Sequence, residues 1–175
     1  LLLTLPGISC TEKLVEEMAK HKGISYMRTT RKATPVIYGN AEKFEIGGSK
    51  VVKESKEDVV TIVGAGVTLD EAIAAHDMLK EKGISARVID LYSIKPLDVK
   101  TLKKAGEETK AMITVEDHFV EGGLGEAIKG VLAGSGIKIH SLAVEKMPRS
   151  GTPDELLNYE GISRNAIVKK VEEIL

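Results

Sequence analysis

The sequence has very little cysteine: Cys10 is the one cysteine in 175 residues, so no disulfide can form within the chain. The absence of a disulfide framework is typical of proteins from a reducing compartment, and we expect a cytoplasmic protein. No apolar run is long enough to cross a bilayer. The leading leucines, residues 1–3, lack the basic flank and long apolar stretch of a signal peptide. The chain also begins without methionine, and we expect it to be a fragment of a longer protein.

Excess charge of either sign is lacking too. The formal net charge is −1, from 25 basic and 26 acidic residues that are interspersed along the chain. This balance does not favour a nucleic-acid or membrane partner. With 42% hydrophobic and 29% charged residues, the composition is that of an ordinary globular domain with its own core.

Beyond residue 53, short apolar runs alternate with segments of helical periodicity. The predicted strands cover residues 59–63, 86–91, 111–116 and 137–144. The predicted helices cover residues 68–82, a segment capped by Asp98, residues 124–133, and two segments capped by Thr152 and Ser163. This alternation implies parallel strands joined by right-handed crossovers. We therefore predict an α/β fold: a doubly wound, mostly parallel sheet with helices on both faces.

Two local details of these helices can be predicted. Thr68 and Glu71 have the spacing of a capping box at the start of the first helix. In the helix over residues 124–133, periodicity turns Leu124, Ile128, Val131 and Leu132 toward the core.

The first fifty-two residues do not follow the same pattern. They contain a predicted helix near residues 9–21 and two short predicted strands, residues 24–27 and 35–38. One helix and two short strands cannot easily bury a core by themselves. We therefore predict a partial α/β segment, the tail of another domain, over residues 1–38, a connector over residues 39–52, and the α/β domain over residues 53–175.

The densest polar cluster is Glu116, Asp117 and His118, at the predicted end of a strand and before a glycine-rich turn. Open α/β sheets bind ligands along this edge, and carboxylate and imidazole groups can bind metals. Three adjacent residues seldom point at one ion, however. We favour a structural or interface role, a polar turn that forms hydrogen bonds with a neighbouring domain or subunit, over a metal site.

Arg28 and Arg31 lie in a polar loop that also contains Lys32. Guanidinium groups bind phosphates through paired hydrogen bonds, so this loop could hold an anionic substrate. A solvated basic turn is an equally good interpretation of the spacing.

Motifs that would indicate a resident active site are lacking. Gly64-Ala65-Gly66 follows a strand, but Leu69 occupies the position of the third glycine of a dinucleotide fingerprint. The sequence has no nucleophile paired with a base, no P-loop and no metal ligands at helical spacing. We therefore predict no catalytic, cofactor-binding or metal-binding residue in this chain.

Taken together, the motifs resemble the C-terminal region of transketolases. They are residues 63–69 (VGAGVTL), 90–98 (DLYSIKPLD), 114–118 (TVEDH), 121–127 (EGGLGEA) and 148–151 (PRSG). Residues 11–13, 26–31 (YMRTTR) and 36–38 resemble the end of the pyrimidine-binding domain of the same enzymes. In that family the arginine that matches Arg31 helps to bind the sugar phosphate, although Lys32-Ala33 here replaces the Pro-Glu that often follows it.

The resemblance implies an enzyme that uses thiamine diphosphate and a divalent metal, Mg or Ca, both held by domains outside this chain. The thiazolium ylid of the cofactor would move a two-carbon ketol unit from a ketose phosphate to an aldose phosphate in the pentose phosphate pathway. Such enzymes are homodimers or dimers of split chains, and this chain alone would be inactive. Two alternatives are a related thiamine enzyme (1-deoxyxylulose-5-phosphate synthase or a 2-oxo acid dehydrogenase beta subunit) and a non-enzymatic interaction or regulatory module.

Overall fold

A five-stranded sheet forms the centre of the molecule. In the computed structural model, which describes residues 1–4, 8–30, 34–109 and 111–175, the strand order is β3-β5-β4-β7-β8. The strands are β3 (Lys50–Lys53), β4 (Val60–Gly64), β5 (Ala86–Asp90), β7 (Ala111–Phe119) and β8 (Ile139–Val144). The last four are parallel, and β3 pairs antiparallel with β5 at one edge. Every residue of β4 and β5 is buried, including the polar residues Thr61, Arg87 and Asp90, because these strands lie inside a sheet that is covered on both faces.

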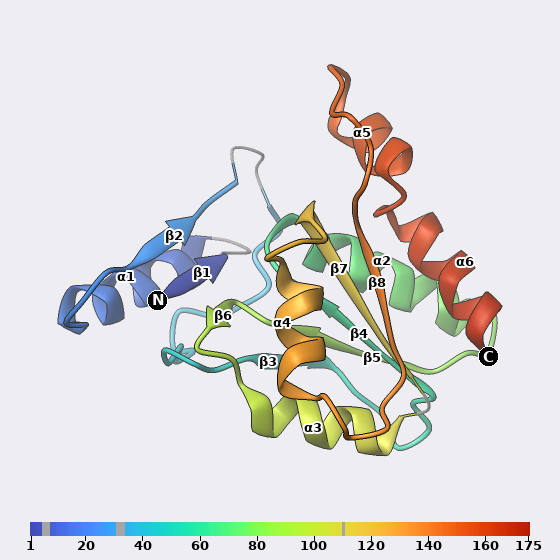
Figure 1. The fold of residues 1–175 in the computed structure, drawn as a ribbon, viewed down its shortest axis with the longest axis horizontal. Coiled ribbons are helices and arrows are strands. Elements are labelled where there is room, and N and C mark those ends of the chain that lie inside the picture. Colours follow the sequence, from blue (N-terminus) through green and yellow to red (C-terminus); the bar gives the residue numbers. More distant parts are fainter. Residues whose placement is uncertain (5–7, 31–33, 110) are drawn as a thin grey trace.

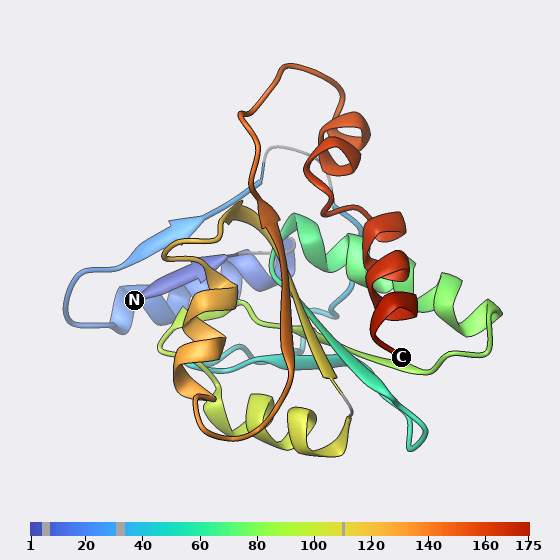
Figure 2. The same ribbon diagram turned by 45° about the vertical axis from the view of Figure 1, so that its right-hand side comes forward.

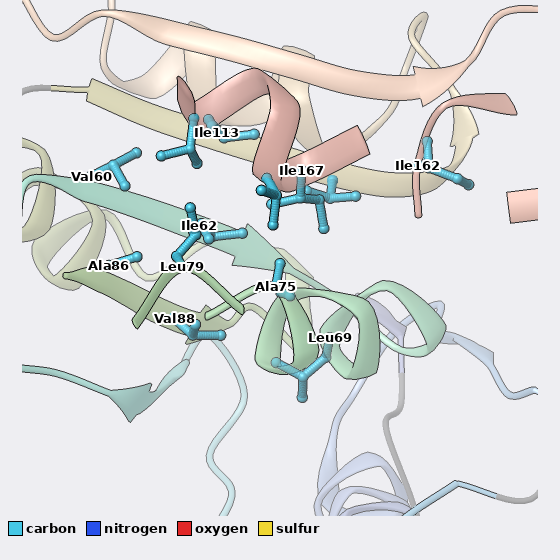
Figure 3. Close-up of a cluster of buried hydrophobic side chains, with 14 of the residues drawn as sticks. Val60, Ile62, Leu69, Ala75, Leu79, Ala86, Val88, Ile113, Ile162 and Ile167 are labelled. Atoms are coloured by element: carbon cyan, nitrogen blue, oxygen red, sulfur yellow. The ribbon is translucent and has the colours of Figure 1, made fainter. Parts of the chain in front are cut away.

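Helices cover both faces of this sheet (Figures 1 and 2). On one face, α2 (Val67–Glu81) and α6 (Arg164–Ile174) share a core cluster with β4 and β7. Figure 3 shows Ile62, Leu79, Ile113 and Ile167 gathered between these elements. On the other face, α3 (Val99–Glu108) and α4 (Leu124–Val131) pack in a second cluster. The doubly wound α/β arrangement predicted from the sequence is therefore confirmed.

The N-terminal segment joins this domain through a second, smaller sheet with the order β2-β1-β6. Here β1 (Leu2–Thr4) runs parallel to β2 (Tyr26–Arg28) and antiparallel to β6 (Ser93–Lys95), which closely follows β5. Between β1 and β2 lies α1 (Ile8–Lys20), and a third core cluster forms where this segment meets the domain. The cluster contains Leu3, Cys10, Leu14, Phe44 and Tyr92.

Helix α5 (Pro153–Glu160) and the loop before it protrude from the rest of the molecule, at the top of Figures 1 and 2. Thr152 and Glu155 form the expected capping box at the start of α5. Asp98 and Ser163 cap α3 and α6 as predicted. Among the described residues, no helix is both long and apolar enough to cross a membrane.

Several strand predictions were wrong or incomplete. Residues 35–38 form no strand, and Val36 is 81% exposed. The three-residue strands β1 and β6 were missed, since they are too short to show alternation. Strand β3 crosses the predicted boundary between residues 52 and 53, so the sheet begins inside the last part of the predicted connector.

Two helix details were also wrong. Helix α2 has no side-chain cap, because it begins at Val67 and its N-cap residue is Gly66. Thr68 lies inside the first turn, where its hydroxyl accepts the Ala65 N–H at 3.1 Å and lies 2.7 Å from the Val115 carbonyl oxygen. Glu71 is buried and binds Arg164 of α6, so Thr68 and Glu71 form no capping box. Val131 is exposed at the end of α4, whereas Leu132, which follows it, is buried in the core as predicted.

Candidate functional site

A cleft of about 650 Å³ lies where the N-terminal segment meets the carboxyl ends of the large sheet. Its walls include Leu2, Tyr26 and Arg28 from the small sheet, and Glu116, Phe119 and Gly123 from β7 and the turn that follows. Ala65, at the end of β4, also lines the cleft. In the strand order β5-β4-β7-β8, the crossover direction changes between β4 and β7, the position where open α/β sheets bind ligands. The N-terminal segment therefore borders the crevice that a ligand occupies in other doubly wound folds.

A bidentate ion pair joins the two sides of this cleft. The Arg28 Nη1 atom donates to Asp117 Oδ1 at 2.9 Å, and Nη2 donates to Asp117 Oδ2 at 2.8 Å. Nη2 also donates to the Asp117 carbonyl oxygen at 3.1 Å. Parallel charge-assisted bonds of this kind give both energy and a defined orientation. Asp117 thus ties β2 to the end of β7.

Glu116 holds the start of α4 in place. Its Oε2 accepts the Leu124 N–H at 2.6 Å and its Oε1 accepts the Gly125 N–H at 2.9 Å, so the carboxylate binds two N–H groups that the helix leaves unpaired. Burial nevertheless raises the pKa of Glu116, because the loss of hydration outweighs these two hydrogen bonds. A Cβ atom at Gly123 would lie 2.1 Å from Glu116 Oε2, which explains the glycine at this position.

His118 lies on the surface beyond these two acids. Its side chain is exposed, and its Nδ1 atom lies 2.9 Å from the Phe119 carbonyl oxygen. The side chains of Glu116, Asp117 and His118 thus have three different partners. Within the described residues, no group of three or more His, Cys, Asp and Glu side chains could hold a metal ion. The predicted interface role of the cluster stays a prediction.

Arg31, the predicted phosphate-binding residue, lies outside the described residues. Arg28, which the sequence placed in the same basic loop, forms the ion pair with Asp117. Between them, Thr29 and Thr30 line a smaller hollow of about 190 Å³ with Gly66 and Asp117. The phosphate-binding role of Arg31 therefore stays a prediction.

The path of the backbone requires glycine at two positions of the turn after β4. A Cβ atom at Gly64 would lie 2.9 Å from the Thr68 carbonyl oxygen, because α2 starts directly against the strand. Gly66 has a φ of 62°, in the left-handed region that favours glycine. These backbone requirements account for both glycines, so a bound nucleotide is not needed to explain them.

Comparison with protein families identifies this arrangement: residues 49–167 match the family model described as "Transketolase, C-terminal domain". The chain belongs to the transketolase family. It is 50% identical over 167 residues to the transketolase of Rattus norvegicus and 49% identical to that of Homo sapiens, covering 94% of this chain in each case. It spans 27% of the length of these transketolases.

Solved structures agree with the family assignment. A structure described as a split gene transketolase, inactive beta4 tetramer, has a TM-score of 0.92 and 33% identity over 98% of this chain and 56% of that chain. Transketolase from Campylobacter jejuni has a TM-score of 0.70 at 17% identity, covering 98% of this chain and 26% of that chain, which shows a shared fold. The resemblance that the sequence motifs indicated is confirmed.

One buried polar group in this transketolase-family chain was not singled out from the sequence. Asp90 ends β5 without any exposed surface, and its Oδ2 accepts the Tyr38 hydroxyl at 2.6 Å. Its Oδ1 has no hydrogen-bond partner among the described residues. Burial raises the pKa of Asp90 to about 7. The sequence signal for this buried acid was an aspartate near the end of the predicted strand over residues 86–91, most of whose residues are apolar.

Proposed function

We propose that this chain is the C-terminal part of a transketolase that transfers a two-carbon ketol unit from a ketose phosphate to an aldose phosphate. The observation that carries the proposal is the identity of about half to the rat and human transketolases across nearly the whole chain. The chain spans 27% of their length, so the activity belongs to the enzyme that it completes.

In this proposal the chain contributes a scaffold and contacts with the other parts of the enzyme. Residues 1–38 form the tail of the pyrimidine-binding domain, residues 39–52 the connector and residues 53–175 the C-terminal domain. The surface of the N-terminal segment supports this division, because Ile24 is 92% exposed and Tyr26 is 58% exposed. Large apolar side chains at such positions fit a segment that packs against further protein.

The acids at the cleft do not fit the thiamine diphosphate and divalent metal that transketolases use. Glu116 is engaged by two backbone N–H groups and Asp117 by Arg28, so neither carboxylate offers a free set of oxygens to a Mg or Ca ion. We therefore assign the cofactor and its metal to the parts of the enzyme outside this chain, and no catalytic step to the residues described here.

The direct substrate contact that we propose for this chain is Arg31, which would bind the phosphate of the sugar. A partner that supplies the cofactor site is also required, either as further domains or as a separate subunit, and we propose a homodimer of the complete enzyme. The split-gene transketolase, described as a beta4 tetramer, supports assembly through this part of the protein. The cytoplasmic location stays a prediction from the cysteine content.

An assay of ketol transfer tests the proposed function. The purified chain with thiamine diphosphate, magnesium and sugar phosphates should show no turnover, and addition of the complementary transketolase part should produce it. Turnover by the isolated chain would contradict the proposed division of labour.

The same assembled protein separates the alternatives. Condensation of pyruvate with glyceraldehyde phosphate would indicate a deoxyxylulose phosphate synthase, and oxidation of 2-oxo acids would indicate a dehydrogenase subunit. A non-enzymatic module would bind a nucleotide as an isolated monomer in calorimetry and form no complex with a transketolase part.

A further inference from the structure

An irregular segment covers the end of β5. Residues 38–48, named here the connector strap, contain no helix or strand and lie between β2 and β3. Among the described residues, the backbone–backbone hydrogen bonds of the strap stay inside it, from Glu42 to Gly39 and from Gly48 to Glu45. Segments that lack such bonds to a neighbour open at a lower free energy than the strands and helices of the core. The strap is therefore attached to the domain through side chains.

Polar and aromatic contacts with residues 92 and 93 hold the second half of the strap. The Glu45 N–H donates to the Tyr92 hydroxyl oxygen at 3.3 Å, and the same hydroxyl donates to the Glu45 carbonyl oxygen at 3.2 Å. The Gly47 N–H donates to the Ser93 hydroxyl oxygen at 3.0 Å. The rings of Phe44 and Tyr92 meet edge to face, with their centroids 5.1 Å apart. These contacts close the strap over the chain that follows β5.

Asp90 lies beneath the first half of the strap. In the sheet it is flanked by Lys50 of β3 and Gly64 of β4, and it has no exposed surface. Water can therefore reach its carboxyl group only when a covering segment moves, and the strap, which contacts it through Tyr38, is such a segment. Asp90 Oδ2 accepts the Tyr38 hydroxyl at 2.6 Å, whereas Oδ1 has no hydrogen-bond partner among the described residues. A buried carboxylate with one oxygen unpaired is unfavourable while it is charged.

Titratable groups approach Asp90 from every element packed against it. They are Tyr38 of the strap, Cys10 of α1, Lys50 of β3, Asp70 of α2 and Tyr92 after β5. Burial raises the pKa of Asp90 to about 7, and the negative charge of Asp70 adds to this effect. The hydrogen bond from Tyr38 and the positive charge of Lys50 oppose it, so burial outweighs the contacts that favour the charged form.

Opening of the strap would return water to Asp90. The hydrated carboxyl group would have its ordinary pKa of 3.8, so the closed form binds the proton more tightly than the open form does. The closed form is then favoured at low pH, and the open fraction grows as pH rises from about 4 to about 7. Above this interval both forms are ionised, and the open fraction levels off.

We propose that residues 38–48 form a pH-responsive strap, which opens when Asp90 loses its proton and closes when Asp90 regains it. The strap connects the N-terminal segment to the large sheet, so this titration controls how firmly the two are joined near neutral pH. The inference concerns this chain alone and does not depend on the proposed function.

Cys10 supplies a natural reporter of strap opening. It is the one cysteine of the chain, it is 1% exposed, and it shares a core cluster with Phe44 of the strap and Tyr92. Burial raises the pKa of the Cys10 thiol, so the closed form should not react with thiol reagents. The rate at which dipyridyl disulfide labels the full chain therefore measures how often Cys10 becomes exposed.

The main test compares labelling of the wild-type chain and of Asp90→Asn at pH 5.5 and pH 8. Asparagine keeps an acceptor for the Tyr38 hydroxyl but does not titrate. Both proteins carry Cys10, so dividing the wild-type rate by the variant rate cancels the pH dependence of the thiol itself. We expect this ratio to rise by about tenfold to thirtyfold from pH 5.5 to pH 8.

Two further variants serve as controls. Ser93→Ala removes a strap contact that does not titrate, and it should speed labelling by about threefold to tenfold, by the same factor at both pH values. Tyr38→Phe keeps the acid and removes the hydrogen bond that favours its charged form. It should speed labelling more at pH 8 than at pH 5.5, which tests the strap even where Asp90→Asn does not fold.

Low concentrations of urea separate strap opening from unfolding of the whole chain. Local opening exposes little surface, so labelling below the unfolding transition should hardly depend on urea. Labelling through global unfolding would accelerate steeply with urea, because its dependence scales with the surface exposed.

The inference is overturned by any of three outcomes. A wild-type to Asp90→Asn ratio that is the same at both pH values would show that Asp90 does not control the strap. A ratio that falls as pH rises would show that ionised Asp90 holds the strap closed. A urea dependence of labelling equal to that of global unfolding would show that the strap does not open separately.

Discussion

Replacement of Asp90 by asparagine should make the stability of the chain less sensitive to pH. Asp90 has no exposed surface, accepts the Tyr38 hydroxyl at 2.6 Å through Oδ2, and has no partner for Oδ1 among the described residues. Burial raises the pKa of this carboxyl to about 7 from an ordinary value of 3.8. Transfer of the charged form into the protein interior is therefore unfavourable at neutral pH.

The sign of the effect follows from linkage. A folded pKa above the unfolded pKa means that the folded protein binds the proton more tightly. The stabilisation is then complete below about pH 4 and is lost as pH rises through 7. A shift of about 3 units corresponds to about 4 kcal/mol over the full range. Between pH 5 and pH 8, ionisation of Asp90 should lower the free energy of unfolding by about 3 kcal/mol of this total.

Urea unfolding of the wild-type chain and of Asp90→Asn at several values between pH 5 and pH 8 measures this quantity. Asparagine still offers an oxygen to the Tyr38 hydroxyl but does not titrate. The free energy of unfolding of the variant should therefore rise relative to wild type by about 3 kcal/mol across this range. Taking the difference between the two proteins cancels the other groups that titrate in the same interval, including the four histidines.

Two results would refute the reasoning about Asp90. A difference between the proteins that stays constant from pH 5 to pH 8 would mean that Asp90 does not titrate there. A difference that moves the opposite way would mean that the Tyr38 hydrogen bond and the positive charge of Lys50 together outweigh burial. As a control, Tyr38→Phe removes the hydrogen bond that favours the ionised form. It should cost about 1.5–3 kcal/mol at pH 8 and less at pH 5.

Four further changes have definite expected outcomes. Gly123→Ala should lower the free energy of unfolding by about 1–3 kcal/mol, since its Cβ atom would lie 2.1 Å from Glu116 Oε2. Gly130→Ala in α4, where a Cβ atom meets nothing within 4 Å, should raise it by roughly 0.5–1 kcal/mol in the same urea titration. Arg31→Ala in the assembled enzyme should raise the KM of phosphorylated sugars about tenfold and that of unphosphorylated sugars much less, and equal effects would remove the phosphate role. Thr152→Ala should destabilise α5 by about 1 kcal/mol. The backbone amides of α5 should then exchange their hydrogens faster in the variant than in wild type, and identical exchange rates would contradict the capping role.

Much of the α/β domain could be predicted because its elements are determined by nearby residues. The mostly apolar strand β4 is buried along its whole length, as its composition indicates. Asp98, Thr152 and Ser163 cap the helices that directly follow them, since a cap needs only the next three residues.

The errors occurred where tertiary contacts decided the outcome. Helix α2 begins at Val67, so Thr68 lies inside its first turn, where its hydroxyl accepts the Ala65 N–H and also contacts the carbonyl oxygen of Val115, 47 residues away. Glu71 pairs with Arg164, 93 residues away, so the local capping pattern was outweighed. Segments of three residues, such as β1 and β6, become strands only because a neighbouring strand lies within hydrogen-bonding distance.

In the candidate site, too, some features follow from the sequence and others from tertiary structure. By itself, the sequence determined the family, the α/β order and the polar cluster at residues 116–118, because motifs and periodicity are properties of consecutive residues. Tertiary structure alone decided the partners: Asp117 meets Arg28 across 89 residues of chain, and Asp90 meets Tyr38 across 52. The first pair joins the small sheet to the carboxyl end of β7, and the second joins β5 to the segment between β2 and β3; no local pattern specifies which side chains such contacts bring together.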